Sequence, residues 1–337
     1  MENEQVFEIL ENSTEPAVKY LYRRDVLGAD PMSPAMVSLQ EEIRGSERVQ
    51  MMLDGREPDG RFPWHAYAKW RGAYWTLFLL SDLGYPAGDP DLFPLREQVL
   101  EWLFNPNHLS RVPLINGRYR RCTVQESSAV FSMLKLGLGD ERTTQLVDLL
   151  LKWQWSDGGW NCDKKKTAAH SSFHESWMPV RALWAYYELS ADLRAREAVE
   201  RASEIFLSRR LFRRLSDGEV MRDSFTRLSY PTYWHYDILN GLMAMGEIGK
   251  LDDPRCAEAL DLLETKRLPD GGFPAELRYY TVTNREVSGV SPVGWGAVSK
   301  RKLNEFVSVR ALSVLKWAGR VSVPKMDYNR IIGEDSQ

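Results

Sequence analysis

The chain has 337 residues, of which 43% are hydrophobic and 27% charged, and this balance excludes collagen-like, disordered and membrane-embedded classes. Its 44 basic and 47 acidic residues leave a formal net charge of −3, which gives no indication of a nucleic-acid partner. Twelve Trp, fourteen Tyr and twelve Phe predict either a very aromatic core or an aromatic-lined cavity.

The cysteines and the apolar runs indicate the compartment. Cys122, Cys162 and Cys256 are too few and too scattered for a disulfide framework, which favours a reducing environment. The longest apolar run, residues 73–80, falls far short of the ~18 residues that a membrane span needs. The first residues are acidic and lack the apolar stretch of a signal peptide. We therefore expect a cytoplasmic protein without a transmembrane segment.

Helical periodicity runs through the whole chain. Residues 5–27 and 34–54 have the apolar spacing of helices, and they predict an N-terminal helix pair, assigned to residues 1–48. Five further apolar stretches follow, most of them with a more charged helical stretch after them. Alternating β-branched runs do not recur, so strands should be nearly absent. The apolar stretches are 72–83, 126–137, 174–189, 235–248 and 305–318, and the charged ones are 91–104, 143–154, 193–210 and 254–265.

A turn signal recurs between the helix pairs. Residues 154–160 read QWSDGGW. Weaker copies of this string occur elsewhere in the chain, and their glycines at positions 60, 117, 218 and 271 align with Gly158. Asp-Gly and Asn-Gly pairs favour turns because Gly tolerates positive φ. Inner stretches that are apolar nearly all round indicate helices buried on both sides. We therefore predict one all-α domain over residues 1–337, an (α/α) toroid of paired inner and outer helices that residues 1–48 complete or cap.

The Gln154-x-x-x-Gly158-x-Trp160 spacing matches the Gln-Trp repeat motif of triterpene cyclases. Over about residues 50–320 the chain resembles the terpenoid cyclase and protein prenyltransferase superfamily, as a squalene–hopene cyclase-like toroid. The strings DGGWNCD (157–163), HSSFHES (170–176) and YWHYDIL (233–239) look like those of bacterial squalene-cyclase-like or prenyltransferase-like proteins. The resemblance implies an active site in the centre and at one mouth of the ring.

The chain departs from both characterised chemistries of this superfamily. It has no Asp-x-Asp-Asp acid motif of the proton-initiated cyclases, and no Asp-x-Cys with which the prenyltransferase zinc set begins. Neither mechanism therefore carries over directly, and candidate site residues must be chosen on their own chemistry.

Acidic residues stand at the starts of four predicted inner helices: Glu126, Glu175, Asp237 and Glu305. In a toroid these starts surround one mouth, although the helix dipole also favours acids there. His174 precedes Glu175 as His235 precedes Asp237 in the next repeat, and such pairs suit general acid–base catalysis. We expect Asp237 to act as the acid, assisted by His235, Glu175 and His174. A helix cap beside a buried histidine is the structural alternative.

Aromatic residues gather around the same positions and could stabilise a carbocation. Ordinary helix packing is the alternative for each of them. The expected substrate-binding residues are Trp160, Phe173, Tyr233, Trp234 and Tyr236, with Glu126 and Glu305 at the mouth.

A metal site is a further hypothesis. Cys162, His170 and His174 form a Cys-x7-His-x3-His pattern that could hold zinc and leave one position open. The chain is thus expected to be an enzyme with an apolar, isoprenoid-like substrate. The alternatives are a metal-dependent enzyme with Cys and His ligands at the cavity mouth, and a non-catalytic toroid that binds a lipid, glycan or protein. The long segment 274–304 is either a functional lid or a loose surface loop.

Overall fold

The structure is a computed structural model, and it describes residues 5–283, 285 and 287–323. Helices dominate these residues, as the sequence predicts. The strands among them are β1 (Leu114–Ile115) and β2 (Arg118–Tyr119), which pair as a short antiparallel hairpin. Every described helix is too short or too polar to cross a lipid bilayer.

Five inner helices form where the sequence is apolar nearly all round, and their ends lie within three residues of the predicted ones. In α5 every residue from Ala73 to Leu80 is buried, which is the pattern of a helix covered on both sides. The inner helices are α5 (Ala73–Leu83), α8 (Val124–Lys135), α10 (Phe173–Ser190), α12 (Ile238–Glu247) and α14 (Glu305–Trp317).

The outer helices are amphipathic, and each packs on the inner helix that precedes it. In α9 the buried residues Leu146, Val147 and Leu150 recur at the helical period, and Asp140 caps the first turn. The outer helices are α6 (Phe93–Leu103), α9 (Glu141–Trp153), α11 (Leu193–Leu207) and α13 (Ala257–Glu264).

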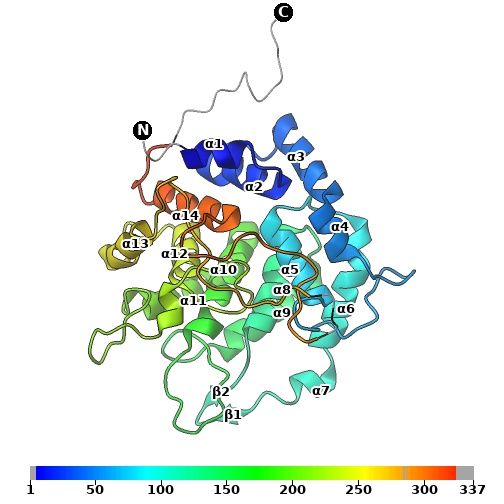
Figure 1. Cartoon of the computed structure of the whole chain (residues 1–337). Coiled ribbons are helices and arrows are strands. Elements are labelled where there is room, and N and C mark those ends of the chain that lie inside the picture. The colour runs from blue at the N-terminus through cyan, green and yellow to red at the C-terminus, as the bar shows by residue number, and fades with distance from the viewer. Residues whose placement is uncertain (1–4, 284, 286, 324–337) are drawn as a thin grey trace, which may run out of the picture.

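The inner helices contact one another in chain order, from α5 through α8, α10 and α12 to α14 (Figure 1). The N-terminal helices continue this series, because α14 contacts both α2 and the π-helical turn η1, and α2 contacts α5. The N-terminal elements are α1 (Gln5–Glu11), α2 (Pro16–Leu21), η1 (Tyr22–Leu27), α3 (Pro34–Gly45) and α4 (Glu47–Leu53); the short helix α7 (Pro106–Leu109) precedes the hairpin.

The repeated turn has the backbone that the sequence predicts. Gly60, Gly117, Gly158, Gly218 and Gly271 all adopt positive φ. At Gly158 the turn also joins neighbouring helices: the Gln154 side-chain amide donates to the Gly158 carbonyl at 2.6 Å and to that of Ala198 on α11 at 2.8 Å. The Trp160 indole donates to the Leu150 carbonyl at 2.9 Å. The motif thus fastens the end of α9 to α11.

The segment 274–304 is packed onto the helices at the described positions. In Figure 1 it crosses in front of the inner helices. Trp295 is fully buried beneath Arg48, whose guanidinium lies 4.9 Å from the centre of the ring. The Trp70 indole donates to the Tyr279 carbonyl at 2.8 Å. These contacts hold the segment against α4 and against the residues just before α5.

Candidate functional site

The two histidines of the predicted acid–base set lie among stacked aromatic rings. The His235 ring is stacked between Trp234, at 3.7 Å between ring centres, and Tyr279, at 3.4 Å. His174 lies 6.3 Å from His235 in an edge-on arrangement. The structure therefore brings the two histidines together, as expected, within this aromatic cluster beneath segment 274–304.

Both histidines are neutral at pH 7. Burial lowers the pKa of His235 to about 3 and that of His174 to about 4. The Nδ1 of His174 accepts the backbone N–H of Tyr236 at 3.0 Å, and the Nδ1–H of His235 donates to the Thr232 carbonyl at 2.9 Å. Each ring thus has one nitrogen committed to the backbone.

Asp237 is the N-cap of α12 and has an extended backbone, so it precedes the first turn in which the sequence placed it. Its side chain is buried. One carboxylate oxygen accepts the Asn240 backbone N–H at 3.0 Å, and the other accepts the Ser229 backbone N–H at 3.1 Å and the Ser229 hydroxyl at 2.8 Å. This is the geometry of a helix cap that also ties down the preceding loop.

Replacing Asp237 with Asn should cost more stability at pH 4 than at pH 7. Burial raises the pKa of Asp237 from 3.8 to about 6. The folded chain therefore binds this proton more tightly, so the stability that the carboxyl contributes is complete below pH 4 and is lost as the pH rises to about 6. Asn does not titrate, so the stability difference between wild type and variant should shrink by up to about 3 kcal/mol over that interval.

Urea denaturation at both pH values checks this prediction. Asp192→Asn is the control, because Asp192 caps α11 in a more exposed place and its hydrogen bond with Arg194 lowers its pKa. Its effect should be small and should grow with pH. A stability difference for Asp237→Asn that is the same at pH 4 and pH 7 would show that burial does not control this carboxyl.

The predicted substrate-binding residues are mostly core residues. Trp160, Phe173, Tyr233 and Tyr236 are buried, and their rings mainly face other rings or helix backbone, whereas Trp234 is partly buried against His235. Tyr233 stacks on Trp70 at 3.7 Å, and the Tyr236 hydroxyl donates to the Leu211 carbonyl at 2.7 Å. Glu305 accepts the Ser13 hydroxyl at 2.9 Å and so links α14 to the N-terminal helices.

A second cluster lies where α8 and α10 begin. The possible ligand atoms of Cys122, Cys162 and Glu175 all lie within 4.8 Å of one another. Cys122 precedes α8, Cys162 follows the turn at Gly158, and Glu175 is in the first turn of α10. The packing of α8 against α10 brings the three together from separate repeats.

This cluster shares Cys162 with the predicted ligand set and lacks its two histidines. His174 is one residue from Glu175 on α10, about 100° round the helix, so it points to the aromatic cluster. His170 lies before α10 and outside the group. Cys122 was not singled out from the sequence. The available signal was its place just before an inner helix, where the neighbouring repeats carry the candidate acids.

Two groups of this cluster, Glu175 and Cys162, have raised pKa values and so favour their protonated forms. Burial raises the pKa of Glu175 well above its usual range. A hydrogen bond with Cys122, together with burial, raises the pKa of the Cys162 thiol. A divalent cation among them would reverse both shifts, because it favours the carboxylate and the thiolates.

The cluster borders a cavity of about 460 Å³ with a strongly basic lining. Cys122 and Cys162 are both part of its wall, and the lining residues include no Asp or Glu. The cations in the wall are Arg111, Arg120, Arg121 and Lys164, and the imidazoles are those of His65 and His108.

Two arginines of this basic cavity differ in their partners. Arg120 is 2% exposed, stacks 4.4 Å above the Trp155 ring, and leaves Nε and Nη1 without a hydrogen-bond partner among the described residues. Arg121 is paired with the buried Glu126 and with the His108 ring. Burial lowers the pKa of His108 to about 4, so this imidazole is neutral at pH 7. Glu126 therefore lies behind the cavity wall, where it holds Arg121.

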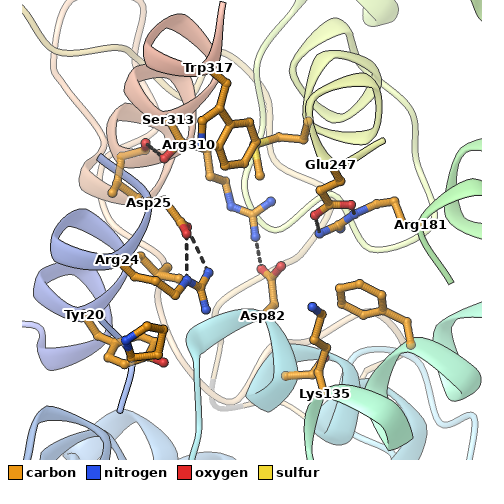
Figure 2. A pocket seen from close by; sticks show the side chains of 16 residues that line it. Tyr20, Arg24, Asp25, Asp82, Lys135, Arg181, Glu247, Arg310, Ser313 and Trp317 are labelled. Carbon is orange, nitrogen blue, oxygen red and sulfur yellow. Dashed lines mark hydrogen bonds and ion pairs between the residues drawn. The ribbon is translucent and has the colours of Figure 1, made fainter. Parts of the chain in front are cut away.

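A second cavity, of about 390 Å³, lies at the other ends of the inner helices (Figure 2). Its wall receives charged side chains from six elements: η1, α5, α8, α10, α12 and α14. Three ion pairs lie in its wall: Arg24 with Asp25, Arg310 with Asp82, and Arg181 with Glu247. We name it the axial cavity. Its sequence positions were not among the predicted site residues.

No protein-family model matches the chain, and no curated protein matches it. Among solved structures, the chain is similar to the type II terpene cyclase MstE from Scytonema, in complex with geranylgeranyl dihydroxybenzoate as its substrate. The sequence identity is 15%, the match covers 86% of this chain and 99% of that chain, and the TM-score is 0.26. At this TM-score the likeness does not bear on the site, and the function rests on the residues described above.

Proposed function

We propose that the chain is a metal-dependent enzyme that holds one zinc ion at Cys122, Cys162 and Glu175 and takes an anionic substrate in the adjoining basic cavity. The observation that carries this proposal is the cluster itself, in which the three ligand atoms lie within 4.8 Å of one another. Two thiolates and a carboxylate form a donor set that suits zinc better than magnesium or calcium, which prefer oxygen ligands alone.

The residues around the cluster have distinct roles in this proposal. Three protein ligands leave zinc one open position, at which it supplies a Lewis acid to the substrate. Arg111, Arg120 and Lys164 would bind the substrate's negative charge, since none of them has a carboxylate partner among the described residues. Arg121 is held by Glu126 and so fixes the orientation of His108 in the cavity wall.

The proposed architecture is a single closed (α/α) toroid, with residues 1–48 completing the ring. The contacts of α14 with α2, and of α2 with α5, support closure. The cluster would lie at the mouth where α8 and α10 begin, and the axial cavity would lie at the opposite mouth. In this architecture the zinc ion and the substrate would lie at the mouth that segment 274–304 covers.

The isoprenoid interpretation is the second candidate, because aromatic rings surround His174 and His235. Two observations count against it. Its rings stack mainly on one another, as Trp70 does on Tyr233 at 3.7 Å, which leaves their faces occupied. Asp237 keeps both oxygens in backbone hydrogen bonds. Metal-dependent chemistry therefore ranks ahead, and a catalytic role for Asp237, His235 and His174 stays a prediction.

Cobalt binding to the reduced full-length protein tests the proposal. Co²⁺ should bind one equivalent and give the charge-transfer absorption of thiolate ligands, and Zn²⁺ should displace it. Cys122→Ser, Cys162→Ser and Glu175→Gln should each weaken binding by more than the roughly 10–100-fold that substitutions outside the ligand shell cost. The control is Cys256→Ser, because Cys256 is buried elsewhere, with its thiol directed to the Lys250 carbonyl at 3.5 Å.

Two results would contradict the metal site. One is binding that is no weaker in Cys162→Ser than in Cys256→Ser. The other is a Cys122–Cys162 disulfide that survives purification with a reductant, because it would remove both thiolates. Thiol titration before loading with cobalt separates this second case from simple loss of metal.

A further inference from the structure

The axial cavity contains more cationic than anionic side chains. Arg24, Arg181 and Arg310 each have a carboxylate partner, and these partners are the three acids of the wall. Lys135 is the fourth cation; it is exposed at the edge of the cavity, and among the described residues its ammonium group has neither a hydrogen bond nor an ion pair. Figure 2 shows its ammonium group pointing into the cavity below Asp82.

We propose that the axial cavity binds a small carboxylate with an apolar body, and that the carboxylate of this ligand pairs with Lys135. The site is separate from the metal cluster, since the two lie at opposite ends of the inner helices.

The position of Lys135 beside a second cation favours an anionic ligand. The Lys135 ammonium lies 5.8 Å from the centre of the Phe131 ring, and the Arg181 guanidinium lies 4.5 Å from the same ring. Glu247 neutralises Arg181 through two hydrogen bonds, at 2.7 and 2.6 Å, and among the described residues it makes no ion pair with Lys135. The side of the cavity around Phe131 therefore keeps one uncompensated positive charge, which a carboxylate would balance.

Arg310 is already paired within this wall and adds no free charge to it. Its side chain is 11% exposed, and its Nε has no hydrogen-bond partner among the described residues. Asp82 accepts from the other end of the Arg310 guanidinium and from the Tyr230 hydroxyl at 3.0 Å. Arg310 and Asp82 thus neutralise each other, and Lys135 remains the cation that a ligand carboxylate would pair with.

Apolar side chains make up most of the rest of the wall, beside the hydroxyls of Ser81 and Ser313, and suit the body of such a ligand. Leu21, Met243, Val309 and Trp317 line the cavity, and Trp317 is 38% exposed at its edge. A cavity of about 390 Å³ is within the range of small-molecule sites, in which a few polar groups fix the orientation of an apolar body.

The helix C-termini around the cavity weaken the preference for an anion without reversing it. The last carbonyls of a helix carry partial negative charge, and α5, α8 and α12 end near this cavity. Part of this negative charge is already compensated, because the carbonyls of Leu80, Ser132 and Ala244 accept the N–H groups of the C-cap residues. Lys135 remains the full charge without a partner.

Calorimetric titration of the full-length protein with hexanoate tests the proposal. Hexan-1-ol has the same apolar body without the charge, and hexylammonium has the opposite charge. We expect hexanoate to bind most tightly of the three. In Lys135→Met, which keeps the apolar stem, hexanoate should bind about tenfold or more weakly, whereas hexan-1-ol should be unaffected. Lys135→Glu should reverse the preference and favour hexylammonium.

Lys152→Met is the matched control. Lys152 also rests on an aromatic ring, at 5.7 Å from that of Tyr119, but lies on α9 away from the axial cavity. It should leave hexanoate binding unchanged. The proposal is overturned if hexanoate does not bind wild type, if it binds Lys135→Met as it binds wild type, or if hexan-1-ol binds as tightly as hexanoate.

Discussion

Replacing Arg310 with methionine should lower the free energy of unfolding by about 3–5 kcal/mol. Arg310 lies in the axial cavity wall and neutralises Asp82, whose side chain is 7% exposed. Methionine removes the positive charge and leaves that carboxylate buried with the Tyr230 hydroxyl as its remaining donor. Loss of one partner from a buried ion pair costs far more than the pair contributes, because the other charge stays desolvated.

Denaturation of the double variant Asp82→Asn/Arg310→Met identifies the cause. If the unpaired carboxylate is responsible, the double variant should regain most of the stability that Arg310→Met loses. Arg194→Met is the control: Arg194 pairs with Asp192 and Asp148, but its side chain is 62% exposed, so its loss should cost less than about 1 kcal/mol. A double variant as unstable as the single one would instead indicate lost packing against Tyr230.

Replacing Gly158 with alanine should destabilise the protein by about 3 kcal/mol. Its φ of +102° lies where L-residues are strained, and an added Cβ would meet the carbonyl oxygen of Arg201 on α11. Because the obstacle is helix backbone, it cannot move aside as a flexible side chain would. The turn would have to shift away from α11, and the hydrogen bonds of Gln154 would be lost with it.

Gly218→Ala provides the comparison at the aligned position of another copy of the repeated turn. Gly218 occupies the aligned position and has a φ of +73°, but an added Cβ would meet open space. It should therefore cost only the backbone term, about 1 kcal/mol. Thermal or urea denaturation of both variants measures the difference, and equal losses would mean that close approach to Arg201 is unimportant.

The helices could be predicted because their signals are local. Apolar period defines the inner helices to within three residues, and aligned glycines define the turns that separate the pairs. The aromatic content indicated a site, but a sequence does not say whether rings face a cavity or one another. In the structure Tyr233 and Trp70 face each other, although they are far apart in the chain.

The candidate sites depend on which helices are neighbours, and the sequence alone does not predict these neighbours. Cys122 and Glu175 meet because α8 packs on α10, so no spacing along the chain signals the pair. His174 fits a metal spacing, but a turn of about 100° from Glu175 directs it elsewhere. Lys135 looks like an ordinary charge at a helix end. Only the convergence of the helix ends shows that its ammonium faces a cavity.

The packing of the N-terminal helices on α14 has a consequence for synthesis of the chain. α1, α2 and η1 all pack on α14, and the hydrogen bond from Ser13 to Glu305 spans 292 positions. At roughly 5–20 residues per second, the ribosome needs about 15–60 s between these two residues. During that interval the apolar faces of the first helices lack their final neighbour. The last inner helix to emerge, α14, therefore supplies this neighbour, and until then the nascent chain must avoid aggregation while the apolar faces of its first helices are uncovered.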